Sequence, residues 1–425
     1  MRFYRKYLPK ISSPKDREIV FANFISLTTL QGLSFILPLL LIPYLIRIIG
    51  ASNFGLIAFA AALAQYFLIL TDYGFSLSAT QNIALNEGQH KRVCEIFSSV
   101  ITIKILLSAL SFVILLAIIN FVPKFKQDWL VYLVSFGAVI GSTLFPLWFF
   151  QGKEKMIHIT AINSLGGIAN VICVFFYVRG PADFLLVPFF NSLFSIVSGI
   201  WGLSVAFKEF DIRFTLQSYR NIRQELKAGW SVFISGVAIN AYTTTRIFAV
   251  GLLTNNLITG YYSIAERIAN FIQVFPLMSF SQAVFPRLNR VYLKNKNKAL
   301  SIMHKVQRIS TSGFWICLPV LFIFSPAIVL AVCGEYNNEV IVALRLLLVS
   351  IIFIGSNAFR VQFLLIARRA DLYSKLHIAA ALIGSPLIFL LTYFFSYRGA
   401  AVSTIIMEAG VFIVTIRLLK MATRK

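Results

Sequence analysis

Long apolar stretches separated by short polar segments run from near the N-terminus to the C-terminus of the chain. Each stretch is continuous rather than alternating, and it is long enough to cross the roughly 30 Å hydrocarbon layer of a bilayer as a helix. The pattern predicts an all-α polytopic membrane protein with about twelve transmembrane helices. We expect these helices near residues 21–46, 54–74, 98–120, 129–149, 157–178, 184–206, 229–252, 259–283, 309–332, 341–366, 374–395 and 399–419.

The composition agrees with this class and excludes others. Of the 425 residues 58% are hydrophobic and 13% are charged, which is typical of a membrane protein rather than a soluble one. The net charge of +23 lies mainly in short loops, so no folded basic face is expected to bind nucleic acid. The cysteines are scattered and lie mostly within apolar runs, and we predict neither a disulfide framework nor a metal site nor a bound cofactor.

The basic residues of the loops orient the predicted helices. One side carries the basic N-terminal tail, the long basic loops 207–228 and 286–308, and the basic C-terminal tail. The other side carries only Arg47, Lys124, Lys126, Arg179 and Arg398. Because cytoplasmic loops are enriched in Lys and Arg, both termini are predicted to be cytoplasmic. The two long basic loops are expected to contact anionic lipid headgroups.

A weak internal repeat divides the chain into halves. The turn at residues 50–55 (GASNFG) is echoed at residues 255–260 (NNLITG), six helices later and in the same orientation. Parallel repeats of this kind relate two bundles about an axis along the membrane normal, with a substrate site between them. We therefore predict an N-terminal six-helix lobe at 1–207, a cytoplasmic linker at 208–228 and a C-terminal six-helix lobe at 229–425.

Ionisable and amide side chains within the apolar helices are the main sign of a polar substrate. A charge in the hydrocarbon layer costs a few kcal/mol or more unless it is solvated or paired, so these side chains are expected to line a wet cavity. The candidates for the cavity lining are Arg47, Gln65, Asn240, Arg246, Arg267, Asn270, Arg345, Asn357 and Arg360. The candidates for binding a proton or a coupling ion are Asp72, Glu266 and Glu408.

Several of these residues also have a purely structural interpretation. Arg47 and Arg345 can extend to a membrane interface, and the amides can hydrogen-bond neighbouring helices together. Glu266 and Arg267 lie about 100° apart on a helix, so they need not pair with each other. The remaining arginines lie deeper in helices of the same lobe, which favours an anionic substrate.

Local motifs in the first half of the chain point to a family. They are PYLIR at 43–47 with Gly50 and Phe54–Gly55, DYGF at 72–75 with Ala79–Thr80, and PLWFFQG at 146–152 with Glu154 and Met156. The chain thereby resembles the Wzx-type polysaccharide flippases, which are bacterial O-antigen translocases of the multidrug/oligosaccharidyl-lipid/polysaccharide exporter superfamily. The second half resembles this family in length and topology.

The resemblance implies two lobes arranged in a V, as in MATE transporters, around a central cavity in the bacterial inner membrane. It implies that the substrate is undecaprenyl pyrophosphate bearing an oligosaccharide repeat unit, which moves from the cytoplasmic to the periplasmic leaflet by alternating access. Arginines in the cavity would hold the pyrophosphate. The sugar, the coupling ion and any contacts with other polysaccharide-export proteins stay open.

Two other functions fit the pattern less well. A multidrug or toxin antiporter of the same superfamily would favour carboxylates and aromatic residues for cationic substrates, whereas arginines equal or outnumber carboxylates within these helices. For a membrane enzyme such as a polysaccharide polymerase, we find no zinc signature, nucleophile elbow or glycine-rich phosphate loop, and the external loops are very short. We therefore predict a transporter rather than an enzyme.

Overall fold

The computed structural model describes residues 14–423, apart from the side chains of residues 14–31, 33–36, 38–39, 275, 279–283, 286–287, 370 and 422–423. The first half of the described chain forms α1 (Pro14–Asp72), α2 (Phe75–Leu85), α3 (His90–Phe121), α4 (Pro123–Gln127), α5 (Trp129–Leu144), α6 (Leu147–Gly152), α7 (Met156–Tyr177), the 3-10 helix η2 (Pro181–Leu185) and α8 (Leu186–Glu209). The second half forms α9 (Tyr219–Thr243), α10 (Thr245–Leu253), α11 (Asn256–Lys294), α12 (Lys296–Ile323), α13 (Ser325–Cys333), α14 (Asn338–Gly355), α15 (Ala358–Ile366) and α16 (Ala370–Thr423).

Eight helical segments of the described chain are long and apolar enough to cross a membrane. Two of them, Leu40–Leu85 and Asp371–Met421, contain 46 and 51 residues, about twice the length that one crossing needs. Each is interrupted by a residue with a positive φ, Gly50 at 79° and Ser396 at 55°, where the helix breaks into two limbs. The second limbs of these two segments, together with α9–α10 and α11, are the further helices that the expected set of about twelve crossings would need. The predicted all-α polytopic class is confirmed.

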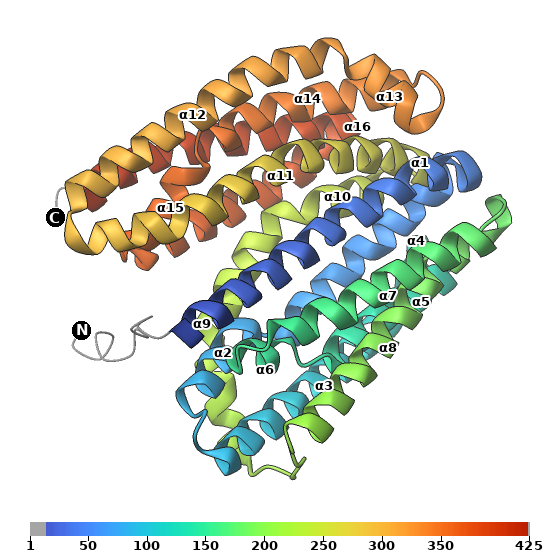
Figure 1. Ribbon diagram of the computed structural model, residues 1–425. Coiled ribbons are helices and arrows are strands. Elements are labelled where there is room, and N and C mark those ends of the chain that lie inside the picture. The colour runs from blue at the N-terminus through green and yellow to red at the C-terminus, as the bar shows by residue number, and fades with distance from the viewer. Residues whose placement is uncertain (1–13, 424–425) are drawn as a thin grey trace.

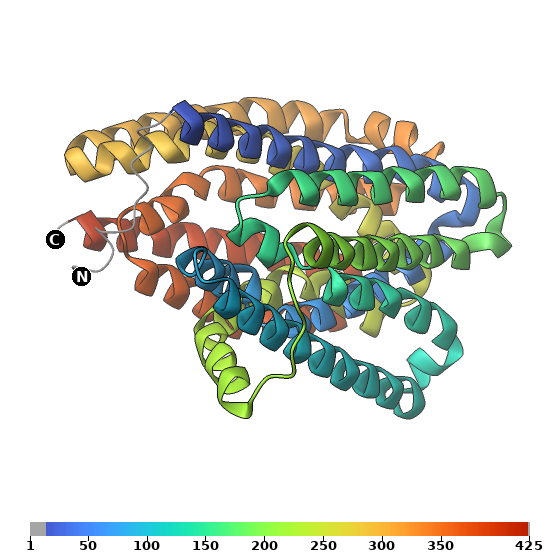
Figure 2. The ribbon, with the colours of Figure 1, turned by 60° about the horizontal axis from the view of Figure 1, so that its bottom comes forward.

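The helices gather in two groups, and α1 and α11 lie side by side where the groups meet (Figure 1). Helices α3, α5, α7 and α8 belong to one group, and α12, α14, α15 and α16 belong to the other. Figure 2 shows the start of α1 and the last turns of α16 at the same end of the molecule. Helix α1 begins and α16 finishes at one end of the molecule, which we call the tail end. We call the opposite end, which carries Gly50 and Gly334, the turn end. The lobe boundaries at 1–207 and 229–425 stay a prediction.

The two turns of the predicted repeat meet at a contact between glycines. A Cβ atom on Gly55, in the second limb of α1, would collide with the backbone of Asn256 and would lie 2.8 Å from the Cα of Gly260 in α11. A Cβ atom on Gly260 would in turn collide with the carbonyl oxygen of Ala51. Only glycine at both positions lets the two backbones approach so closely, as small residues do at helix contacts in membranes. This contact joins the two halves near the turn end.

The motif at residues 146–152 forms part of the core of the first group. Pro146 separates α5 from α6, because proline cannot continue the hydrogen-bonding pattern of a helix. The bend turns Trp148 and Phe149 inward, where both are fully buried and lie 5.4 Å and 5.3 Å from the ring of Phe97 in α3. Packing in the core of this group accounts for Trp148 and Phe149 of the motif.

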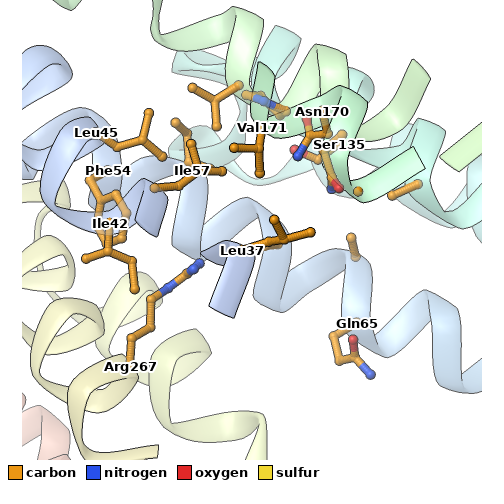
Figure 3. A pocket seen from close by; sticks show the side chains of 18 of the residues that line it. Leu37, Ile42, Leu45, Phe54, Ile57, Gln65, Ser135, Asn170, Val171 and Arg267 are labelled. Carbon is orange, nitrogen blue, oxygen red and sulfur yellow. The ribbon is translucent and has the colours of Figure 1, made fainter. Parts of the chain in front are cut away.

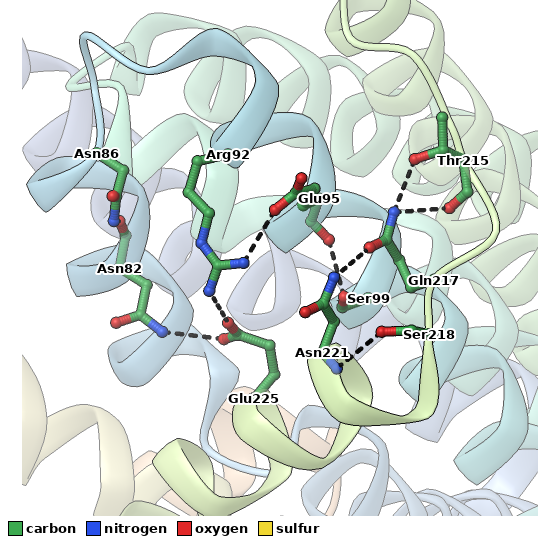
Figure 4. Close-up of polar contacts among 10 residues, drawn as sticks. All are labelled: Asn82, Asn86, Arg92, Glu95, Ser99, Thr215, Gln217, Ser218, Asn221 and Glu225. Carbon is green, nitrogen blue, oxygen red and sulfur yellow. Dashed lines mark hydrogen bonds and ion pairs between the residues drawn. The ribbon is translucent and has the colours of Figure 1, made fainter.

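A buried carboxylate fixes the start of α9 to the first group at the tail end (Figure 4). Glu225 accepts a hydrogen bond from Asn82 of α2 at 2.9 Å and lies 3.9 Å from the guanidinium of Arg92 in α3. Burial raises the pKa of the Glu225 carboxyl, and the hydrogen bond from Asn82 and the charge of Arg92 oppose this shift. The predicted linker 208–228 thus includes the end of α8 and the first turns of α9, and α9 contacts helices of both groups.

We expect Gly260→Ala to destabilise the protein by about 1–3 kcal/mol, because the new Cβ overlaps the backbone of α1 and forces the helices apart. The measurement is the thermal unfolding temperature of the purified protein in detergent. Gly313→Ala in α12 is the matched control, because its Cβ would meet no atom within 4 Å. The control should be neutral or gain up to about 1 kcal/mol from helix propensity. Equal unfolding temperatures for the two variants would contradict the glycine contact.

Candidate functional site

A cavity of about 510 Å³ lies among the two limbs of α1, α5, α7, α8 and α11 (Figure 3). Part of its wall is apolar and includes Leu45, Ile57 and Val171. The rest is polar and comes mainly from α7 and α8, with Gln65 from the second limb of α1. Among the described residues that line it, Arg267 is the one with a charged side chain. The cavity is therefore neutral and polar on one side, with a single cation at its edge.

Arg267 reaches the cavity from α11, across the contact between the two groups of helices (Figure 3). The guanidinium carbon lies 5.2 Å from the centre of the Phe54 ring, which is the range of a cation–π contact. It makes no ion pair with any carboxylate of the described chain. The charge of Glu266 acts on Arg267 from a greater distance. An arginine with an aromatic neighbour and no carboxylate at ion-pair distance is able to bind an anion that enters the cavity.

The neighbouring residue in α11 belongs to a different cluster. Glu266 is buried, and its Oε1 lies 3.2 Å from the Nε of Arg246 in α10. Arg246 also donates a hydrogen bond to the carbonyl of Thr243 at 3.2 Å, and its charge interacts with that of Glu408 in α16. The offset of about 100° between residues 266 and 267 directs the two side chains to these different surroundings. Two of the three coupling candidates thus share one arginine.

The third coupling candidate, Asp72, lies elsewhere. It ends α1 next to a break at Tyr73 and Gly74, and it accepts a hydrogen bond from Ser76 at 2.6 Å. Lys104 of α3 interacts with its charge; this lysine is 4% exposed and donates to the carbonyl of Ser142 at 2.9 Å. Lys104 is not among the predicted site residues, although a lysine within an apolar run is visible in the sequence itself.

Two of the predicted cavity arginines cap other helices. Arg47 donates to the carbonyl of Ala331 near the end of α13 at 2.8 Å, which links α1 to the second group at the turn end. Arg345 donates to the hydroxyl of Ser325 at 2.9 Å and lies 5.0 Å from the centre of the Phe322 ring. Neither is among the residues that line the cavity.

The remaining predicted cavity residues also lie outside its lining. Arg360 donates to the carbonyl of Ser356 at 3.0 Å, with its guanidinium 5.0 Å from the centre of the Phe412 ring. The amides of Asn357 and Asn240 bond to Thr415 at 3.3 Å and to Gly236 at 2.9 Å, and Asn270 is exposed. Of the predicted substrate residues, the structure brings only Gln65 and Arg267 into this cavity.

The sequence interpretation missed three asparagines of the cavity wall, Asn163, Asn170 and Asn191. Asn163 and Asn170 are seven residues apart in α7 and therefore share a helix face. That spacing is the signal that could have revealed them. The structure adds the hydroxyls of Ser135 and Ser164 to the same wall. Among the described residues, no group of three or more His, Cys, Asp or Glu side chains is placed to hold a metal ion.

Comparison with known proteins identifies the family. The model of a family described as "Polysaccharide biosynthesis protein" matches residues 20–292. The chain belongs to this family. A relative from Escherichia coli (strain K12), named "Putative O-antigen transporter", is 32% identical over 387 residues, which cover 91% of this chain and 93% of that protein. A relative of the same name from Shigella dysenteriae is 24% identical over 403 residues, 94% of this chain and 99% of that protein.

Solved structures share the fold of this polysaccharide biosynthesis protein. The lipid II flippase MurJ in an inward closed conformation superposes with a TM-score of 0.74 at 14% identity, over 95% of this chain and 87% of that one. An inward-facing MATE family transporter of the MOP superfamily gives a TM-score of 0.68 at 14% identity, over 92% of this chain and 99% of that one. The resemblance to polysaccharide flippases is confirmed, and the names of the relatives support a transporter over an enzyme.

We expect Arg246→Met to destabilise the protein by about 3–5 kcal/mol, because it leaves the buried carboxylate of Glu266 without its partner. The double variant Arg246→Met/Glu266→Met should recover most of this loss, since apolar residues of similar size replace the whole pair. Thermal unfolding of the purified single and double variants measures both effects. A double variant no more stable than the single one would show that the pair is not a unit.

Proposed function

We propose that this protein flips undecaprenyl pyrophosphate bearing an oligosaccharide repeat unit from the cytoplasmic to the periplasmic leaflet of the bacterial inner membrane. The observation that carries the proposal is the cavity among α1, α5, α7 and α8, which Arg267 enters from α11 without an ion pair to any carboxylate of the described chain and opposite a polar, uncharged wall. The names of the curated relatives, which are O-antigen transporters, agree with this substrate class.

The charge of the substrate sets the physical problem. A pyrophosphate cannot enter hydrocarbon without compensation, because an isolated ion costs many kcal/mol there. A guanidinium can form two parallel charge-assisted hydrogen bonds with phosphate oxygens, which offsets much of that cost. Arg267 is positioned for this role, and the polyprenyl tail would stay in lipid while the head group occupies the cavity. Arg246 and Arg360 would also bind the pyrophosphate when the two helix groups move relative to each other.

Alternating access follows from rocking of one helix group against the other. With both termini in the cytoplasm, the tail end faces inward and carries the long basic loops, and the turn end faces the periplasm. The glycine contact between Gly55 and Gly260, and the bond from Arg47 to Ala331, then hold the two groups together on the periplasmic side. Opening to the periplasm requires that these contacts separate.

A proton or a cation would bind at the acidic residues and return the protein to the conformation that accepts a new substrate. Glu266 and Glu408 interact with the charge of Arg246, so a change in the charge of either one alters the pairing of that arginine. Asp72, next to the break between α1 and α2, is a second such site. Membrane lipids surround the helices, and other polysaccharide-export proteins would receive the flipped unit.

A multidrug antiporter is the alternative that the MATE-like fold raises. Such a transporter binds organic cations, for which a carboxylate in the cavity is the natural partner. The charged lining residue in the described part of this cavity is an arginine instead. Uptake of a cationic dye by vesicles that contain the purified protein would favour the antiporter.

Deletion of the gene in its host should abolish surface polysaccharide and cause the lipid-linked repeat unit to accumulate on the cytoplasmic side. The measurements are surface-polysaccharide staining and leaflet-specific extraction of the lipid. Accumulation of the units on the periplasmic side would point to a polymerase instead.

We expect Arg267→Ala to reduce complementation of that deletion by about tenfold or more at a normal protein level, because one charge-assisted interaction with the phosphate is lost. Arg267→Lys should restore part of the activity, since it keeps the charge without the bidentate geometry. Arg213→Ala is the control, because this arginine is 80% exposed in the loop before α9. Normal export by the alanine variants of Arg267, Arg246 and Arg360 alike would contradict a cationic cavity.

A further inference from the structure

Four neutral amides line one cavity, and none of them has a hydrogen-bond partner among the described residues. Gln65 comes from α1, Asn163 and Asn170 from α7, and Asn191 from α8. We call these four residues the amide wall. Figure 3 shows Asn170 and Gln65 on a different side of the cavity from the side chain of Arg267. Within the described part of the chain, none of the four side chains makes a hydrogen bond, and the Oδ1 of Asn170 is shielded from solvent.

Amides that only join helices behave differently in this protein. Asn82 bonds to Glu225, Asn357 bonds to Thr415, and Asn53 bonds to the carbonyl of Pro181. In a membrane, an amide that serves as a link between helices forms such a bond across to its neighbour. The amide wall does not, although Ser164 beside it also has a shielded hydroxyl without a partner. Of the amide wall, Gln65, Asn163 and Asn170 are half-buried and Asn191 is exposed. A buried polar group needs a hydrogen-bond partner, so the shielded Oδ1 of Asn170 and hydroxyl of Ser164 point to a molecule in the cavity that supplies one.

The chemistry of the wall selects the kind of ligand. Each amide offers two N–H donors and one carbonyl acceptor, and each hydroxyl of a sugar is both a donor and an acceptor. A phosphate presents acceptors only, and a cation seeks carboxylates, so neither matches a neutral wall of mixed donors and acceptors. A volume of about 510 Å³ is in the range of pockets that enclose small polar ligands.

We propose that the amide wall is the subsite that binds the hydroxyl groups of an uncharged part of the glycan, and that it selects which repeat unit the protein accepts. This inference rests on the proposed function. Arg267 would hold the pyrophosphate at the cavity edge, while the sugars next to it extend toward Asn163, Asn170 and Asn191. Arg267 thereby binds the charged part of the head group, and the amide wall binds its neutral part.

The test compares two lipids on the purified full-length protein. The probes are undecaprenyl pyrophosphate without sugar and the same lipid carrying the repeat unit, extracted from the deletion strain. Binding is measured by the shift in unfolding temperature over a series of lipid concentrations. The variant is Asn163→Leu/Asn170→Leu, and Asn120→Leu is the control, because Asn120 is an exposed residue of α3 that bonds to its own helix at Leu116.

The double variant should bind the glycolipid at least about tenfold more weakly, because two or more hydrogen bonds are lost, and should bind the sugar-free lipid as the wild type does. Without lipid it should unfold at or above the wild-type temperature, since the amides have no protein partners to lose. If it does not fold, Asn163→Ala/Asn170→Ala takes its place. Arg267→Ala should weaken the binding of both lipids.

Three results would overturn the subsite. If the double variant binds both lipids like the wild type, the amide wall holds only water, and the proposed function stands without it. If the variant loses both lipids equally, the wall does not distinguish the sugar. If the wild type binds neither lipid, the proposed function fails and the subsite fails with it.

Discussion

The two halves pack backbone against backbone at Gly55 and Gly260, where a Cβ atom on either residue would collide with the other helix, and the place of Arg267 at the cavity depends on this contact. Helices in lipid gain little from apolar burial against each other, so close packing of small residues supplies much of their attraction. Arg267 lies seven residues after Gly260, on the same face of α11. The approach of the glycines therefore directs that arginine across the junction and against Phe54 of α1. Wider packing would leave it in its own half.

The charges inside the helices separate into two kinds because their neighbours differ. Arg246 and Glu266 form an ion pair at 3.2 Å. In this arrangement the pair therefore leaves few groups for a substrate to bind. Arg267 has an aromatic neighbour and forms no ion pair with a carboxylate of the described chain, which leaves its donors available. In the proposed transport cycle, the paired charges would change partners as the helices move, and Arg267 would bind the substrate.

Much of the architecture was predictable because its causes are local. An apolar run of about twenty residues must form a helix in lipid, where each backbone group needs an internal hydrogen bond. The predicted turn at Gly50 follows from the backbone freedom of glycine. The helix expected at 129–149 is in fact broken at Pro146, whose missing N–H cannot continue the hydrogen-bonding pattern. The repeat of residues 50–55 at 255–260 was also visible, although its consequence, a direct contact of Gly55 with Gly260, was not.

The sequence by itself determined the class of protein, the approximate positions of the helices and the family, since hydropathy and local motifs do not depend on distant residues. It also identified Gln65 and Arg267 among the polar residues of the helices. Only the tertiary structure separated Arg267 from Arg246, and only it gathered Asn163, Asn170 and Asn191 with Gln65 around one cavity. Packing between residues far apart in the chain decides which face of a helix contacts which neighbour, and hydropathy does not reveal these contacts.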